Sequence, residues 1–293
     1  MMYQSVKKSI SIIIDNPVLT MSFVIYLIFL TFLMPKLFMW QNIIVFGLII
    51  ILMLLFTSAF FAGWLQMIKT AIENSKKENR TDEERIKEFS QMRNDFFSAV
   101  PVYILPIAGA IVLYLIMFFA LLTFNIKFAN HFIGSLDFLI EKINSIPQDA
   151  QGLHAFFEAL PQDKIMILWY WQILFLFTFG LFNFLIMFWA SALYYPEKCT
   201  TSPLSALKNS FLAIFKHPVK SLALYMFILI LGMLFRIIGV FFTTNVVLYF
   251  IFMVLFIYFW VFVFVLIFDY YESRFYNHGD NGCDLLGKNK TLD

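Results

Sequence analysis

The sequence predicts an all-α polytopic membrane protein with six transmembrane helices, and three observations support that prediction. Of the 293 residues, 61% are hydrophobic and 20% are aromatic, whereas only 14% are charged. A soluble domain has about a quarter charged residues, so this chain has too few polar groups to cover a soluble fold. Long stretches free of Asp, Glu, Lys and Arg recur along the chain. They lack the alternation of a β-barrel strand, which favours membrane-spanning helices.

Six stretches are long enough to cross a hydrocarbon core, which takes about 20 mostly apolar residues in a helix. The stretch 221–268 contains one charge, Arg236, and is far too long for a single crossing, so we expect it to turn near Gly239. The expected spans are residues 17–35, 41–68, 100–124, 165–194, 219–240 and 245–270. Together they form one membrane domain over 1–275, and a flexible cytoplasmic tail follows over 276–293.

Short amphipathic helices precede two of these spans in the same register. Residues 3–14 and 204–215 place apolar side chains at identical offsets, 201 residues apart, and the helices end at Pro17 and Pro218. Residues 86–100 repeat the pattern more loosely before a third proline. We therefore predict three repeats, each an amphipathic helix followed by a helical hairpin, with the amphipathic helices in the cytoplasmic headgroup layer.

The segment around the second of these prolines also resembles a known group of proteins. Residues 206–211 read Ala-Leu-Lys-Asn-Ser-Phe, and His217, Pro218 and Val219 follow before a membrane span. This pattern resembles bacterial six-span membrane proteins that include the membrane domain fused to glycerophosphodiester phosphodiesterases. The resemblance implies a six-span architecture and a role in transport or envelope lipid handling. It implies no catalytic residues, because the phosphodiesterase domain of the fused proteins is absent here.

Lys and Arg are concentrated in segments that fall on one side of the predicted membrane. These segments are the N-terminal helix, residues 69–99 and 195–220, and the tail, whereas the opposite side holds Lys36 and the lysines of 125–164. Because basic loops remain in the cytoplasm, both termini are predicted to be cytoplasmic in a bacterial inner membrane. The basic residues form no clustered face, so we expect no nucleic-acid partner.

Residues 125–164 form the sizeable predicted loop outside the membrane, and they read as two amphipathic helices that cap the spans. This outer cap is either a passive lid or a site for a protein partner, and the cytoplasmic amphipathic helices are the other candidate for such a site. Membrane lipids surround the spans in either case. His154 and Glu158, together with His131, Asp137 or Glu141, have metal-ligand chemistry, but their spacing is that of ordinary exposed polar residues. We therefore predict no metal and no cofactor.

Three polar residues inside the predicted spans are candidates for a substrate path. Asn183 lies near the middle of the fourth span, Gln172 lies nearer its outer end, and Arg236 lies about one turn below the outer interface of the fifth. Buried amides also join helices to one another, and an arginine near an interface extends its charge into the headgroups. Each of the three residues therefore has a structural alternative to a role in transport.

Small residues form a second candidate surface, on the second span. Ser58, Ala59, Ala62 and Gly63 place small side chains four residues apart, which allows another helix to approach closely. That helix belongs either to the same chain or to a second copy, so the oligomeric state stays open at this point.

The sequence contains no His-Glu-x-x-His zinc motif, no Gly-x-Ser-x-Gly elbow and no Walker loop, so we predict a protein that is not an enzyme. Our leading hypothesis is a transport-related protein, either a small permease or the membrane subunit of a transporter, and it predicts that Asn183, Gln172 and Arg236 face one cavity. The alternative is a non-transporting scaffold for envelope components. It predicts tight contacts around these three residues, with the amphipathic helices or the outer cap as the conspicuous surface.

Overall fold

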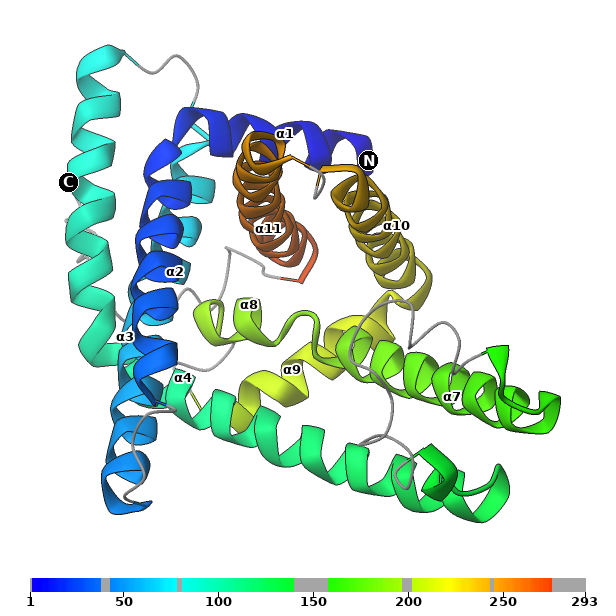
Figure 1. Cartoon of the computed structure of the whole chain (residues 1–293). Coiled ribbons are helices and arrows are strands. Elements are labelled where there is room, and N and C mark those ends of the chain that lie inside the picture. Colours follow the sequence, from blue (N-terminus) through cyan, green and yellow to red (C-terminus); the bar gives the residue numbers. More distant parts are fainter. Residues whose placement is uncertain are drawn as a thin grey trace. The chain divides into compact units, whose positions relative to one another are not determined.

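A computed structural model describes residues 2–37, 43–77, 81–139, 158–196, 202–242 and 245–275 (Figure 1). These residues contain helices and no strand, which confirms the predicted all-α fold. The helices are α1 (Met2–Asp15), α2 (Pro17–Leu37), α3 (Ile43–Asn74), α4 (Asp82–Phe132), α7 (Gln162–Ile186), α8 (Trp189–Tyr194), α9 (Pro203–Lys216), α10 (Pro218–Phe242) and α11 (Val246–Phe275).

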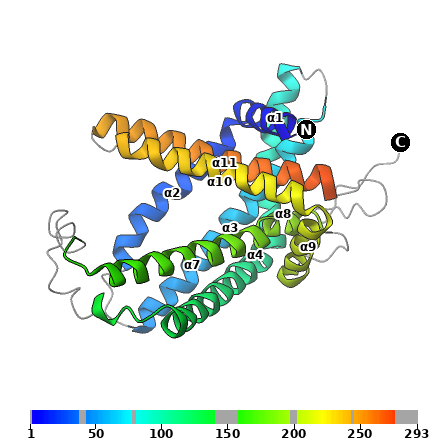
Figure 2. The ribbon, with the colours of Figure 1, turned by 90° about the vertical axis from the view of Figure 1, so that its right-hand side faces the viewer.

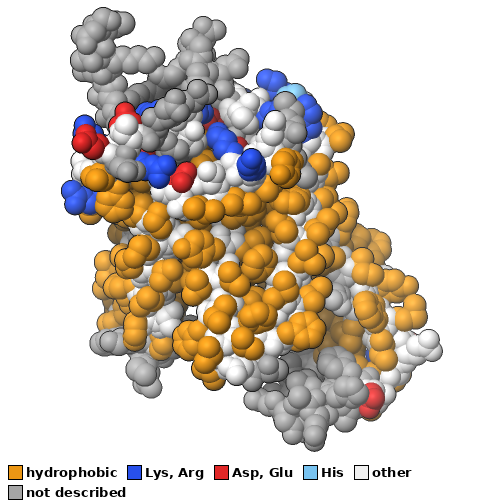
Figure 3. Space-filling view, turned by 90° about the horizontal axis from the view of Figure 1, so that it is seen from above, with side chains coloured by type: hydrophobic (Ala, Val, Ile, Leu, Met, Phe, Trp, Pro, Cys, Tyr) orange, Lys and Arg blue, Asp and Glu red, His pale blue; other side chains and the backbone are white. Residues whose placement is uncertain are grey.

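Six helical segments are long and apolar enough to cross a membrane, and they match the six predicted spans in order. They are Pro17–Pro35, Ile44–Asn74, Glu83–Phe132, Gln162–Tyr194, Pro218–Phe242 and Val246–Phe275. On the face drawn in Figure 3, hydrophobic side chains cover most of the surface and charged side chains gather toward one end. The chain is therefore a polytopic helical membrane protein.

The helices form two compact units. Unit 1 contains Met1–Ile111 and Ile186–Asp293, and unit 2 contains Val112–Leu185. The boundary falls within α4, whose first part belongs to unit 1 and whose last part belongs to unit 2. Unit 1 therefore includes α1, α2, α3, α8, α9, α10 and α11, while α7 lies in unit 2.

Unit 2 pairs the last part of α4 with α7. The ring centroids of Phe118 and Phe179 lie 5.1 Å apart, which gives the two helices an aromatic contact. The side-chain amide of Asn125 donates a hydrogen bond to the hydroxyl of Thr178 over 2.7 Å. Because lipid offers no hydrogen bonds, a buried amide in a membrane helix gains from such a partner on its neighbour.

The end of α4 extends into the segment that we predicted as the outer cap, residues 125–164. The helix continues to Phe132, and Gly134 follows with a φ of +129°, a value that glycine adopts without steric strain. The indole of Trp171 on α7 donates to the Gly134 carbonyl over 2.9 Å, which holds this turn against the helix. Residues 140–157 of the cap lie outside the described residues.

The amphipathic helices α1 and α9 both end directly before a span that begins with proline. One non-helical residue separates each pair, Asn16 between α1 and α2 and His217 between α9 and α10. Proline suits the first turn of a helix, because its missing N–H has no partner there. Equivalent side chains 201 residues apart share their burial in the two pairs. The buried equivalents include Ser9 with Ser210, Ile13 with Ile214, and Thr20 with Ser221.

The third element of the predicted repeat has a different form. α4 runs without a break through Pro101 and Pro106, so the amphipathic helix expected at 86–100 and the span expected at 100–124 are one helix. A proline inside a helix removes one backbone hydrogen bond, and membrane helices tolerate that loss where other groups supply partners. The threefold repeat therefore stays a prediction, and two of its three members share the helix break.

The predicted fourth span, 165–194, is divided in the structure. α7 ends at Ile186, and α8 begins at Trp189 after a turn at residues 187–188. α8 belongs to unit 1, where Tyr194 is fully buried. The sequence does not predict this division, because the residues on both sides of the turn are equally apolar.

The core of unit 1 surrounds the second half of α3. Trp64 is fully buried there, and its indole N–H donates to the Leu19 carbonyl of α2 over 2.9 Å. The Tyr194 hydroxyl of α8 donates to the Ala62 carbonyl over 2.7 Å. Within an otherwise apolar core, hydrogen bonds thus join α2 to a side chain of α3 and α8 to the backbone of α3.

The small residues predicted as a packing face lie at this contact. Ser58, Ala62 and Gly63 are buried, and Ala59 is half-buried. Phe96 of α4 packs directly on Gly63, and a Cβ added there would overlap the Phe96 ring. This face of α3 thus makes close contacts within the chain, to α4 and α8.

Ion pairs join helices at the end of unit 1 where α1 lies across α11 (Figures 1 and 2). The pairs are Lys8 with Asp269 at 2.5 Å, Lys76 with Glu272 at 2.9 Å, and Lys77 with Glu88 at 3.6 Å, measured from nitrogen to oxygen. The three carboxylates are buried, while the lysines remain partly exposed. We call the part of unit 1 that contains these three ion pairs the charged end. Its residues are Lys8, Lys76, Lys77, Glu88, Asp269 and Glu272.

Gly63→Ala is expected to lower the stability of the protein, because the added Cβ forces the Phe96 ring to move. Overpacking of this kind costs about 1–3 kcal/mol. Gly47→Ala in the same helix is the matched control, since nothing lies within 4 Å of that position and alanine favours a helix. Size-exclusion chromatography after heating in detergent measures the unfolding midpoint of each variant. Equal midpoints would contradict the close packing of Phe96 on Gly63.

Lys8→Met is expected to lower the free energy of unfolding by about 2 kcal/mol, because it leaves the buried Asp269 carboxylate without its cation. Lys7→Met is the control, as Lys7 is exposed on the same helix. A second change, Asp269→Leu, should recover part of the loss, since neither charge is then left alone. Unfolding midpoints of the single and double variants complete a double-mutant cycle, and strictly additive effects would argue against the pair.

Candidate binding groove

An apolar groove lies between α2, α3 and the first part of α4, all within unit 1. Its volume is about 490 Å³. The lining consists of Val18, Ser22, Ile25, Tyr26, Phe29, Phe56, Phe60, Met67, Phe89, Arg93, Phe96 and Phe97. Half of these residues are phenylalanine, and polar atoms are few. Such a lining offers a ligand hydrophobic contact and almost no hydrogen bonds, which suits a hydrocarbon chain.

Stacked aromatic rings form a fixed wall of the groove. The rings of Tyr26 and Phe60 are nearly parallel with centroids 4.1 Å apart, and those of Phe29 and Phe56 lie 4.4 Å apart. The Tyr26 hydroxyl donates to the Thr57 hydroxyl over 3.2 Å, which fixes the orientation of its ring. The wall is therefore formed before any ligand arrives, so binding does not have to order these side chains.

The groove runs lengthwise along the membrane helices, starting from the charged end. Its lining on α2 extends from Val18 to Phe29, and its lining on the antiparallel α3 extends from Met67 to Phe56. At 1.5 Å per residue, eleven residues of helix span about 16 Å. The hydrocarbon core of a bilayer is about 30 Å thick, so the groove has the depth of one leaflet.

Arginine and phenylalanine alternate along the side of α4 that borders the groove. Arg85, Phe89 and Arg93 are spaced by four residues, which places them on one face of the helix. Arg93 lines the groove, and Phe97 continues the face one turn further from the charged end. The polar part of the groove therefore lies at its charged end, and the apolar part lies deeper along the spans.

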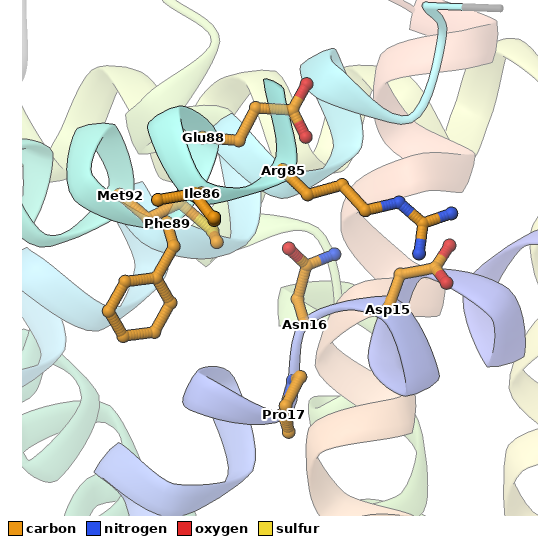
Figure 4. Close-up of a pocket in the computed structure, with 8 residues that line it drawn as sticks. All are labelled: Asp15, Asn16, Pro17, Arg85, Ile86, Glu88, Phe89 and Met92. Atoms are coloured by element: carbon orange, nitrogen blue, oxygen red, sulfur yellow. The ribbon is translucent and has the colours of Figure 1, made fainter. Parts of the chain in front are cut away.

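A second pocket of about 240 Å³ lies next to the groove (Figure 4). Its lining consists of Asp15, Asn16, Pro17, Arg85, Ile86, Glu88, Phe89 and Met92. Phe89 borders both spaces, so the pocket adjoins the groove at the charged end. Figure 4 shows the Arg85 side chain extending toward Asp15, above the side chain of Asn16. Half of its lining residues are charged or amide side chains, so the pocket is more polar than the groove.

Arg93 contributes a positive charge to the groove, whereas the carboxylates around the adjoining pocket lie close to other cations. Glu88 lies 3.6 Å from Lys77, and Asp15 has the Arg85 side chain extending toward it. Among the residues that the structure describes, no carboxylate lies within ion-pair distance of Arg93, and its side chain is exposed. A negatively charged group at the mouth of the groove would therefore be attracted to Arg93.

The three residues of the predicted polar path occupy two units. Gln172 and Asn183 lie on α7, and their separation of eleven residues places them on the same side of that helix. Both side chains are exposed, and the Asn183 amide donates to the Phe179 carbonyl of its own helix. Arg236 lies on α10 in unit 1, where its side chain is exposed. The common cavity for all three residues therefore stays a prediction.

The metal-ligand candidates are only partly described. His131 is exposed near the end of α4, and Glu158 is exposed before α7, while His154 lies outside the described residues. Within the described ranges, no group of three His, Cys, Asp or Glu side chains is close enough to hold a metal ion. The described side chains thus give no support for metal binding at these positions.

Sequence reasoning did not identify the groove or its arginines. In the sequence Arg85 and Arg93 are two basic residues of the predicted cytoplasmic segment 69–99, and their spacing around Phe89 places all three on one helix face. That spacing is the one signal in the sequence that points to the site. The groove itself depends on which helices pack together, and hydropathy does not carry that information.

No protein-family model, curated protein or solved structure matches this chain. Its function is therefore inferred from the groove, the adjoining pocket and the charges between them.

Proposed function

We propose that this chain is a lipid-handling membrane protein that holds a phospholipid acyl chain in the groove between α2, α3 and α4. The observation that supports this proposal most directly is the lining of the groove, which is aromatic and aliphatic along its length and has Arg93 at its charged end. A polar metabolite would lose its hydration in such a groove and find few hydrogen-bond partners. An acyl chain fits the same lining without that cost.

This proposal is the transport hypothesis with a lipid as the transported substrate. The protein acts as a small lipid permease or as the membrane subunit of a lipid transporter, and the groove is its substrate site. The excess of Lys and Arg on one side of the spans supports an orientation with the charged end in the cytoplasmic leaflet of a bacterial membrane. The groove then draws its lipid from that leaflet.

The scaffold hypothesis is supported by a different set of side chains. Tyr3, Ile14, Leu204 and Phe215 on α1 and α9 are each more than three-fifths exposed, although all four are large and apolar. Such side chains enter the headgroup layer when an amphipathic helix lies on a membrane, and they also suit a protein partner. Under this alternative, the lipid in the groove is a permanent structural component and does not exchange.

Ser22→Trp is expected to lower the amount of bound phospholipid about tenfold, because an indole at this position fills the groove. Native mass spectrometry after extraction in mild detergent counts phospholipid molecules per chain. Met21→Trp is the matched control, since Met21 neighbours Ser22 on α2, does not line the groove and is 64% exposed. If both variants retained the phospholipid of the unchanged protein, the groove would not be the lipid site.

A second measurement separates transport from the scaffold alternative. Exchange of a fluorescent phospholipid between the protein in vesicles and added acceptor vesicles gives the lifetime of the bound lipid. Rapid exchange that Ser22→Trp abolishes is expected for a lipid transporter. A lipid that stays bound through extraction and does not exchange would favour the scaffold.

A further inference from the structure

We infer that the lipid in the groove is a phospholipid with an anionic headgroup, and that Arg93 binds its phosphate. This inference rests on the proposed function, because it names the class of lipid that the same groove holds. Three features of unit 1 support it: the depth of Arg93 along the helices, the distribution of charge around it, and the polar pocket beyond it.

Arg93 lies where the phosphate of a lipid in the groove would lie. Phe96 and Phe97 follow it on α4 and line the groove, and Glu88, five residues before it, belongs to the charged end. Arg93 therefore marks the transition from charged to apolar lining. In a bilayer the phosphate occupies the same transition, directly outside the hydrocarbon core. An acyl chain lying along Tyr26 and Phe60 would bring its phosphate to this level.

The guanidinium of Arg93 matches a phosphate in shape as well as charge. It offers several N–H donors in a planar fork, which binds two phosphate oxygens at once. Because no carboxylate of the described residues lies within ion-pair distance of Arg93, a bound phosphate does not displace a protein anion from it. A phosphodiester with no positive headgroup charge then neutralises the mouth of the groove.

The adjoining pocket favours an anionic headgroup over one that carries an amine. The Arg85 side chain extends toward Asp15 and Lys77 lies 3.6 Å from Glu88, so each carboxylate has a cation near it that weakens its attraction for an ammonium group. Arg93 and Arg85 equal in number the two carboxylates that line these spaces, and Lys77 beside Glu88 adds one further positive charge. The pocket's volume of about 240 Å³ leaves space for a small polar headgroup beyond the phosphate.

The test compares phosphatidylglycerol with phosphatidylcholine and phosphatidylethanolamine of the same acyl chains. The full-length protein is reconstituted in nanodiscs with equal amounts of the three lipids, and native mass spectrometry identifies the lipid that it keeps. We expect phosphatidylglycerol to exceed each of the others about tenfold. Equal retention of all three, or a preference for phosphatidylethanolamine, would overturn the inferred headgroup.

Arg93→Gln is expected to abolish this preference, while the total amount of bound lipid changes little because the apolar groove is intact. Arg93→Lys should keep part of the preference, since a lysine retains the charge and loses the fork. Lys87→Gln is the matched control: it removes one positive charge from an exposed position on the same helix that lines neither the groove nor the pocket. A preference that survives Arg93→Gln would also overturn the inference.

The variants separate failure of this inference from failure of the proposed function. If the groove binds lipid without choosing the headgroup, Ser22→Trp lowers total binding and Arg93→Gln leaves the lipid composition unchanged. If the groove binds no lipid, neither variant changes the bound lipid in amount or in kind.

Discussion

Three buried carboxylates at the charged end each pair with a lysine from another segment, and these pairs constrain the positions of the helices around them. Asp269 near the end of α11 pairs with Lys8 of α1, and Glu272 pairs with Lys76 directly after α3. An unpaired carboxylate in this environment would cost several kcal/mol, so alternative packings that separate the partners are excluded. The ion pairs add little to the net free energy of folding. Their main effect is to favour one packing of the helices over others that would separate the charges.

The groove is a consequence of that arrangement together with the small residues of α3. Lys77 and Glu88 join the end of α3 to the start of α4, and Gly63 lets Phe96 approach the α3 backbone. α4 is thereby fixed beside α3 at the charged end. Tyr26 of α2 stacks on Phe60 of α3, so both walls are held by the same helix. The space that remains between α2 and α4 is the groove.

Hydropathy predicted the six spans, because crossing a bilayer depends on length and composition and little on tertiary contacts. The helix starts at Pro17 and Pro218 were equally accessible from the sequence, since proline favours a first turn. Local patterns did not show that α4 continues through Pro101, or that the chain turns between Ile186 and Trp189. Both outcomes depend on tertiary packing, which overrides local sequence patterns.

The candidate site could not be predicted from the sequence, because it also depends on tertiary contacts. Arg93 differs from the other cations of its segment only through its surroundings: Lys77 lies near a carboxylate across a helix contact, and Arg93 faces the groove. A sequence gives the number of charges but not their partners. The charged end pairs Lys8, Lys76 and Lys77 with carboxylates of the protein itself. At Arg93 the described chain provides no such partner, and the groove beside it opens along the membrane helices. Under the proposed function a membrane lipid supplies this anion, so the charge pairing that joins the helices would also select the ligand.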